Sequence, residues 1–396
     1  MTRMPARFKA LIAVVAFAVL AFMWVPTLLS PAVAGGVSSV ALVASAERVT
    51  FGETVTLTAT TVPAVVGEPI AILDASGAQL VSGSTDQNGS FSAEVQPKAN
   101  LLAHASVQAV ESSPVAVGVQ PVMTLRSGGI RLFDDVRVRG TFRPIRQGER
   151  VTIELQHRGT VVATKRAVMD AHGRFSATFR VLHAGSYRAR AVAHTDDLLP
   201  GRAATAPSVT PLPDLSSGAR GIFVGLLGRR LVELHYHLDG VDQVFDYRTA
   251  DAVMAFRKVQ RLPRTQNVNV TVWRALGTPK LFVPRNRAAG VHIEVDQTRQ
   301  VLAVVRAGKV EALIHVSSGK PSTPTHDGTF HVFSKLAGSS PKGLYYPSFF
   351  DGERAIHGWT DVPTYAASHG CVRMPYWVTL WMFAQDPIGT PVIIYH

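Results

Sequence analysis

The feature that most restricts the fold is an internal repeat in the first half of the chain. The segment PAVVGEPIAIL at residues 63–73 is matched by PIRQGERVTIEL at 144–155, and DQNGSFSAEV at 86–95 is matched by DAHGRFSATF at 170–179. The offsets are 81 and 84 residues, so the second copy carries about three extra residues between its landmarks. One small unit is therefore built twice.

Both copies show the alternation of apolar and polar side chains that indicates β-strands, as at Val55, Leu57 and Ala59. Gly89 follows an Asn and Gly173 follows a His, and such pairs are typical of tight turns between strands. Short strands joined by such turns favour two β-sandwich modules. The modules resemble bacterial immunoglobulin-like repeats, which implies a role in spacing or in contact with the substrate.

A linker rich in Pro and Ser, at residues 206–218, precedes a change from strand to helix periodicity. We expect three helices, with Thr249 capping the second and Gly277 ending the third. The apolar helix faces are Val224, Leu227, Leu231 and Leu234, then Ala252, Val253, Phe256 and Val259, then Val272, Trp273 and Leu276.

This three-helix unit resembles a peptidoglycan-binding domain. His235 stands where that family usually has Gly, and Arg257 where it usually has Gln. Two interpretations of His235 and His237 are open. They are a metal-binding pair or, as their positions on either side of the apolar Tyr236 favour, surface histidines. The matching residues are Leu231, Tyr236, Asp239, Gly240, Asp242, Phe245, Thr249, Ala252, Val253, Phe256, Trp273, Ala275 and Leu276.

From residue 290 the alternation of strands returns, with a turn at Gly308, and the C-terminal region is expected to be mostly β. It contains the single cysteine of the chain, Cys371, in the stretch SHGCVRM. One cysteine cannot form a disulfide within its own chain, so in an exported protein it is a reactive thiol or an intermolecular link. The polar neighbours and the preceding glycine argue against a buried apolar role for the thiol.

His357, fourteen residues before Cys371, is suited to take the thiol proton and to remain as an imidazolium beside the thiolate. The backbone N–H groups of Gly370 and Cys371 are positioned to hold an oxyanion. Arg373 offers a guanidinium that binds a carboxylate through two hydrogen bonds. A zinc site of His357, His369 and Cys371 would lack a fourth ligand, so no metal and no cofactor are expected.

The region from about residue 284 to 396 resembles the YkuD-like L,D-transpeptidase catalytic domain. The motifs that carry the resemblance are VSSGKPSTPTHDGTF at 316–330, YYPSFF at 345–350, AIHGW at 355–359 and SHGCVRM at 368–374. Two features depart from the family: the gap between His357 and Ser368 is short, and Gly358 replaces the Ser of some relatives. A backbone carbonyl is therefore the expected partner that orients the imidazole.

The resemblance implies that Cys371 is the nucleophile and His357 the base, while His369 and Gly370 shape the site. The expected substrate-binding residues are Arg373, Tyr345, Tyr346, Ser368 and Gly358. The implied reaction makes 3→3 peptidoglycan cross-links through a thioester, with donor and acceptor stem peptides as partners and carbapenems as inhibitors. Two alternatives remain open: an L,D-carboxypeptidase, and a non-catalytic structural protein that binds the cell wall.

The N-terminus predicts export. Arg3, Arg7 and Lys9 precede an apolar run and an A-x-A pattern that ends at Ala34, as in a secretory signal peptide, with an uncleaved membrane anchor as the alternative. The formal charge is +12, and +9 without these three basic residues, which favours anionic surfaces such as wall polymers over nucleic acid in an exported protein. The expected location is the cell wall or the outer face of the cytoplasmic membrane.

The expected fold class is therefore mainly β and multidomain. The expected parts are a signal peptide or anchor at 1–34, immunoglobulin-like sandwiches at 37–120 and 121–210, a peptidoglycan-binding-like domain of three helices at 217–280, and an L,D-transpeptidase-like catalytic domain at 284–396.

Overall fold

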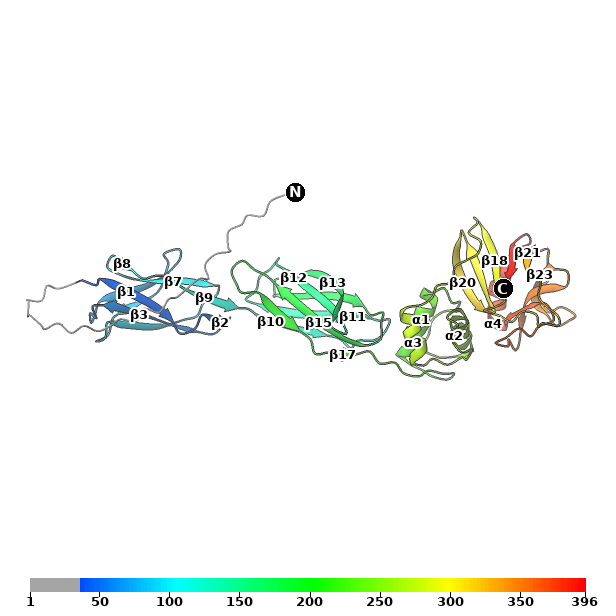
Figure 1. Ribbon diagram of the computed structural model, residues 1–396, viewed down its shortest axis with the longest axis horizontal. Coiled ribbons are helices and arrows are strands. Elements are labelled where there is room, and N and C mark those ends of the chain that lie inside the picture. Colours follow the sequence, from blue (N-terminus) through cyan, green and yellow to red (C-terminus); the bar gives the residue numbers. More distant parts are fainter. Residues whose placement is uncertain (1–35) are drawn as a thin grey trace, which may run out of the picture. The chain divides into compact units, whose positions relative to one another are not determined.

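The computed structural model describes residues 36–396, so the expected signal peptide lies outside the described residues. These residues form 26 strands and four helices, which confirms the prediction of a mainly-β chain (Figure 1). None of the helices in this part of the chain is long and apolar enough to span a bilayer. By its contacts the chain separates into two compact units.

The first unit covers the described residues up to 45, with 56–95 and 102–115. A sheet has the order β1-β3-β6, and β4 pairs antiparallel with both β5 and β7. Alternate residues of β3 are buried, as the sequence alternation requires. The strands are β1 (Ser39–Ala44), β3 (Val55–Val62), β4 (Pro69–Asp74), β5 (Gln79–Ser84), β6 (Ser90–Val95), β7 (Leu101–Val107) and β8 (Val110–Glu111).

The second unit covers the remaining residues. It begins with β2 (Arg48–Thr50) and β9 (Val115–Gln120), which pair in parallel. A module of two antiparallel sheets follows, with strand orders β10-β11-β14 and β13-β12-β15-β16. Its strands are β10 (Val122–Ser127), β11 (Asp135–Arg143), β12 (Arg150–His157), β13 (Thr160–Val168), β14 (Arg174–Arg180), β15 (Ser186–Ala193), β16 (Gly201–Ala204) and β17 (Ser208–Val209).

The matched turns of the two repeats have the same local structure. The Asp86 carboxylate accepts hydrogen bonds from the backbone N–H groups two and four residues later, at 2.8 and 2.9 Å, and the Asp170 carboxylate does the same at 2.8 Å for both. Gly89 and Gly173 both have positive φ, 69° and 71°. The repeat in the sequence therefore encodes one turn twice, with glycine at the position that needs a left-handed backbone.

Three helices follow: α1 (Ile222–Glu233), α2 (Tyr247–Val259) and α3 (Val270–Gly277). The expected end of α3 at Gly277 is confirmed. The expected cap of α2 is wrong, because Asp246 caps the helix and its carboxylate accepts from Thr249 N at 3.0 Å. Thr249 thus lies in the first turn, three residues after the cap.

The expected surface position of His237 is also wrong. His237 is half-buried and stacks on Trp377 and Trp381, with ring centroids 5.5 and 4.0 Å apart. His235 is exposed. Within residues 36–396 no three His, Cys, Asp or Glu side chains gather as metal ligands would.

The C-terminal domain contains two sheets and one helix that the sequence analysis did not predict, α4 (Tyr376–Gln385). The sheet orders are β20-β19-β18-β26-β21 and β22-β23-β24-β25, and buried residues of both sheets and α4 form one core. The strands are β18 (Val291–Asp296), β19 (Val301–Arg306), β20 (Lys309–His315), β21 (Gly328–His331), β22 (Ser334–Lys335), β23 (Tyr345–Asp351), β24 (Arg354–Trp359), β25 (Val372–Pro375) and β26 (Pro391–Tyr395).

Candidate active site

His357 lies on β24 and is 1% exposed. Its Nδ1 is 2.9 Å from Gly358 O, and because a carbonyl only accepts, Nδ1 carries the proton and Nε2 is left as an acceptor. Burial, with a smaller contribution from the charge of Arg373, lowers the pKa of His357 to about 4. The imidazole is therefore a neutral base at pH 7, oriented by a backbone carbonyl as the sequence analysis expected.

Cys371 comes directly before β25, which runs parallel to β24 and pairs His357 with Arg373 in its register. The thiol is half-buried and lies 3.8 Å from Glu353 O, to which it donates. Burial raises the pKa of the Cys371 thiol, and the nearby positive charges oppose this rise. Within residues 36–396 no hydrogen bond joins the sulfur to the His357 ring.

The resting pair is therefore a neutral thiol and a neutral imidazole. This differs from the thiolate–imidazolium pair expected from the sequence, because burial penalises the charged form of both groups. A neutral pair of this kind suits general-base catalysis, in which the base takes the thiol proton during attack and no preformed thiolate is needed. Geometry of this kind often tightens only when substrate is bound.

The SHGC segment is a rigid loop tied by its own side chains. The buried Ser368 hydroxyl donates to Cys371 O at 2.5 Å and accepts from Gly370 N at 3.1 Å. The Thr325 hydroxyl donates to Gly370 O at 2.9 Å. Gly370 has a φ of 112°, and a Cβ there would lie 2.8 Å from Arg354 Nε. Only glycine fits this position without strain.

These contacts change the expected oxyanion site. The Gly370 N–H is already bonded to Ser368 Oγ, so it is not available to a substrate carbonyl. The Cys371 N–H has no hydrogen-bond partner in the part of the chain that the structure describes. Of the two groups expected from the sequence, the Cys371 N–H is therefore the donor that remains free.

Arg373 is fixed through its backbone and open at its guanidinium. It exchanges two backbone hydrogen bonds of 2.9 Å with Ser317, and its guanidinium lies over the Trp359 ring at 4.8 Å. Within residues 36–396 it forms no ion pair with a carboxylate. His369 is exposed, and its Nε2 lies 3.2 Å from Lys320 Nζ, so the structure places it at the rim and not beside the sulfur–imidazole pair.

The two tyrosine candidates lie in different surroundings. Tyr345 pairs with Gly358 across β23 and β24, and a Cβ on Gly358 would meet its ring at 3.0 Å and Thr379 Oγ1 at 2.4 Å. Tyr345 also lines a cleft of about 540 Å³. Tyr346 packs instead on Phe383, with centroids 5.2 Å apart. Tyr345 is therefore the tyrosine beside the base, and Gly358 is required by its neighbours.

Sequence reasoning missed two residues of the site, Arg354 and Thr325. Arg354 lies three residues before His357, packs on Gly370 and contributes positive potential at Cys371. Its Nη1 lies 3.2 Å from Asp351 Oδ2. Both residues stand inside or directly beside motifs already singled out, but only the folded loop shows their contacts.

The loop between His357 and Ser368 is held by α2. Arg264, just after that helix, donates to Thr364 O at 2.6 Å. The buried Lys258 on α2 donates to His315 Nδ1 at 2.6 Å, and His315 Nε2 donates to Val362 O at 3.0 Å. The three-helix region is thus packed into the catalytic domain and is not a separable attachment.

Comparisons with known proteins assign the C-terminal region to a family. The family model for the YkuD L,D-transpeptidase catalytic domain matches residues 290–394. No curated protein sequence matched the chain. Among solved structures, an L,D-transpeptidase fragment (residues 123–326) from Xylanimonas cellulosilytica is 31% identical, with 48% of this chain and 100% of that chain covered and a TM-score of 0.44.

A catalytic domain of the Enterococcus faecium L,D-transpeptidase, solved by NMR as acylated by ertapenem, is 30% identical. It covers 28% of this chain and 100% of its own, with a TM-score of 0.24. The family model and the 31% identity over the full length of the Xylanimonas fragment agree on the same catalytic domain. The chain belongs to the L,D-transpeptidase family and is an L,D-transpeptidase with a YkuD catalytic domain at its C-terminus.

Proposed function

We propose that this protein is an exported cysteine L,D-transpeptidase that forms 3→3 peptidoglycan cross-links through a thioester on Cys371. The observation that carries the proposal is the arrangement of His357. Its Nδ1–H is bonded to Gly358 O, its Nε2 is free to accept, and the strand beside it begins immediately after the only cysteine. A base and a nucleophile on adjacent strands are what acyl transfer requires.

The first half-reaction makes the acyl-enzyme. Cys371 Sγ attacks the carbonyl of the third residue of a tetrapeptide stem while His357 Nε2 takes the thiol proton. The Cys371 N–H donates to the oxyanion that develops on that carbonyl oxygen. The C–N bond then breaks, and the His357 proton passes to the departing amine of the terminal D-alanine.

The second half-reaction restores the enzyme. The side-chain amine of a neighbouring stem attacks the thioester, and the neutral His357 Nε2 accepts a proton from it. The C–S bond breaks, and the proton returns to the sulfur. One amide is broken and one is formed, so the reaction needs no cofactor.

Cations around the sulfur suit a donor stem that carries carboxylates. Arg373 faces the site without an ion-pair partner in the described residues, and Arg354 and Lys342 also favour negative charge at Cys371. The Enterococcus relative is acylated by ertapenem, a carbapenem. We therefore infer that carbapenems acylate Cys371 here, with Arg373 drawing in the drug's carboxylate.

The test is product analysis with a disaccharide-tetrapeptide, read by mass spectrometry. The expected product is a dimer that has lost one D-alanine. Tripeptides without dimers would assign the protein as an L,D-carboxypeptidase, in which water takes the acyl group. An unchanged substrate, with folded protein, would favour a structural wall-binding role. Export is tested separately by locating the protein in cell fractions.

A further inference from the structure

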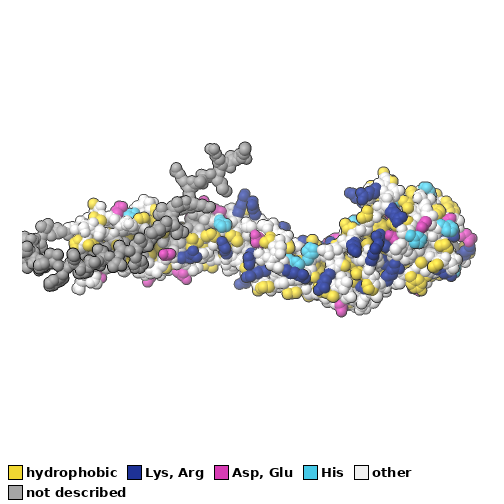
Figure 2. Space-filling model, viewed as in Figure 1, with side chains coloured by type: hydrophobic (Ala, Val, Ile, Leu, Met, Phe, Trp, Pro, Cys, Tyr) yellow, Lys and Arg dark blue, Asp and Glu magenta, His cyan; other side chains and the backbone are white. Residues whose placement is uncertain are grey.

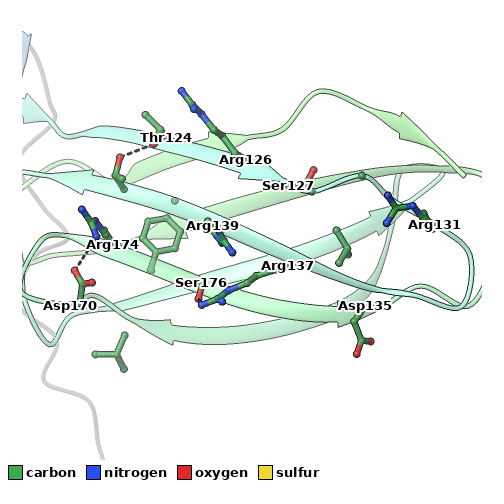
Figure 3. Close-up of a pocket in the computed structure, with 17 residues that line it drawn as sticks. Thr124, Arg126, Ser127, Arg131, Asp135, Arg137, Arg139, Asp170, Arg174 and Ser176 are labelled. Carbon is green, nitrogen blue, oxygen red and sulfur yellow. Dashed lines mark hydrogen bonds between the residues drawn. The ribbon is translucent and has the colours of Figure 1, made fainter. Parts of the chain in front are cut away.

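The outward face of the sheet β10-β11-β14 carries an unusual set of arginines. Residues of β11 alternate strictly between exposed and buried, so Arg137 and Arg139 point away from the core. Arg126 on β10 and Arg174 on β14 are exposed on the neighbouring strands. These four residues, the arginine face, line a groove of about 1200 Å³ (Figure 3).

The register of the sheet places like charges together. Arg126 lies directly opposite Arg139 across β10 and β11. Like charges at such positions repel and destabilise a sheet. Within residues 36–396 none of the four arginines forms an ion pair, and Arg137 contacts only the Ser176 hydroxyl, at 3.2 Å. The groove thus has more arginines than carboxylates along its lining.

Two carboxylates line the groove, and one of them, Asp170, accepts a hydrogen bond from the backbone N–H of Arg174. Asp170 accepts two backbone hydrogen bonds of 2.8 Å within its turn. Asp135 lies 3.9 Å from Arg180, outside the arginine face. The groove therefore keeps a net positive charge.

The other sheet of the same module is also rich in arginine, but its arginines lie opposite other residue types. There Arg190 lies directly opposite Glu154 across β12 and β15, while Arg188 lies opposite Gln156 and Arg202 opposite Val192. On the face drawn in Figure 2, Lys and Arg side chains gather over this module. Of the two sheets in this module, β10-β11-β14 is the one in which two arginines lie directly opposite each other.

The chemistry of the groove identifies its occupant. Its unpaired cations are all arginines, whose planar forks bind phosphate oxygens bidentately. Arg137 and Arg139 are two residues apart on one strand, which spaces them by roughly 6.6–6.8 Å. Hydroxyls border them: Thr124 and Thr141 share a 2.7 Å hydrogen bond, and Ser176 contacts Arg137. Repeated charges along an open groove suit an extended chain.

We propose that the arginine face binds a linear phosphodiester polymer of the cell envelope and so holds the enzyme to the wall. The site is independent of the catalytic chemistry. Binding through the second β module also differs from wall binding through the three-helix region, which is packed into the catalytic domain.

The test measures binding of the full chain to a poly(glycerol phosphate) of about 20 units by fluorescence anisotropy at several salt concentrations. Arg126→Gln and Arg139→Gln should each weaken binding about 3–10-fold at about 0.1 M salt, since each removes one charge-assisted contact. The slope of log K against log salt should fall by roughly 0.7–0.9 for each arginine removed. Arg190→Gln removes the same charge from the other sheet of the module, where Arg190 lies opposite Glu154, and should change binding less than 2-fold, roughly the effect of long-range charge alone.

None of the variants should lower the melting temperature, and Arg126→Gln and Arg139→Gln should raise it slightly because each removes a repulsive pair. All should keep the wild-type rate of acylation by a carbapenem, because none of the substituted residues belongs to the active site. An equal loss of affinity in Arg190→Gln would mean that binding depends on net charge alone, and it would overturn the proposal. Tighter binding of a polygalacturonate, of an oligonucleotide of equal charge, or of vesicles with 30% anionic lipid (about that fraction is enough to attract basic proteins) would also overturn it.

Discussion

Lys258 offers a sharp test of how the helices support the catalytic domain. Its ammonium is buried, with the residue 2% exposed, and donates to Gln300 O at 3.0 Å, to Val316 O at 2.9 Å and to His315 Nδ1 at 2.6 Å. Three acceptors match the three N–H groups of a protonated lysine. Burial lowers the pKa of Lys258 well below its ordinary value.

Lys258→Met keeps most of the side-chain volume and removes all three donors. Each stranded acceptor costs about 1–3 kcal/mol. We use the low end of this range because the variant no longer buries an ammonium and so avoids the cost of desolvating it. The free energy of unfolding should therefore fall by about 3 kcal/mol. For a cooperative unit of 150–250 residues this lowers the melting temperature by roughly 6–12 °C.

The assay is denaturant and thermal unfolding of the full chain, with Lys309→Met as the matched control. Lys309 is exposed at the first position of β20, so its substitution should change stability by no more than about 0.5 kcal/mol. Carbapenem acylation of Lys258→Met should also slow, because His315 loses the partner that fixes it against Val362 O. A stability change below about 1 kcal/mol would refute the assigned role of Lys258.

Three further predictions concern the active site. Cys371→Ala should abolish turnover and shift stability by less than about 1 kcal/mol, since the thiol is half-buried with one weak hydrogen bond; retained turnover would exclude it as nucleophile. Gly370→Ala should destabilise by roughly 1–3 kcal/mol and slow acylation, because its φ is 112° and Arg354 fills the space; wild-type stability would contradict the assigned strain. The pKa of His357 is about 4 in the folded protein and has an ordinary value of 6.5, so the unfolded chain binds more protons between these pH values. The stability that the neutral His357 contributes, about 3 kcal/mol at most, is therefore lost as the pH falls from about 6.5 to 4. A His357→Asn variant should lack that part of the pH dependence, and an unchanged pH–stability curve would show that the histidine is not buried neutral.

The sequence predicted the parts of the fold that depend on local pattern. Alternation marked the strands, and the turns at Gly89 and Gly173 were predicted because glycine supplies positive φ. The cap of α2 was misplaced because Asp246 and Thr249 are both good capping residues, and only the hydrogen bond distinguishes them. The helix α4 was missed because it is apolar on most sides and shows no helical periodicity.

The remaining errors concern contacts between distant segments. His237 was placed at the surface because the tryptophans that stack on it lie about 140 residues away. Lys258 gave no signal at all, since its partners belong to the catalytic domain. The repulsive pair Arg126 and Arg139 becomes visible only through the register of two strands. The nucleophile and base, by contrast, were proposed from local motifs.

Thioester formation on Cys371 is the central step of the proposed function, and intact-protein mass spectrometry tests it most directly. The protein is incubated with a disaccharide-tetrapeptide without an amine acceptor, quenched in acid and digested to locate the adduct. The mechanism predicts an added mass equal to the substrate minus one D-alanine, carried by the peptide that contains Cys371 and absent from Cys371→Ser. An adduct on another residue, or cross-linking activity that persists in Cys371→Ser, would contradict it.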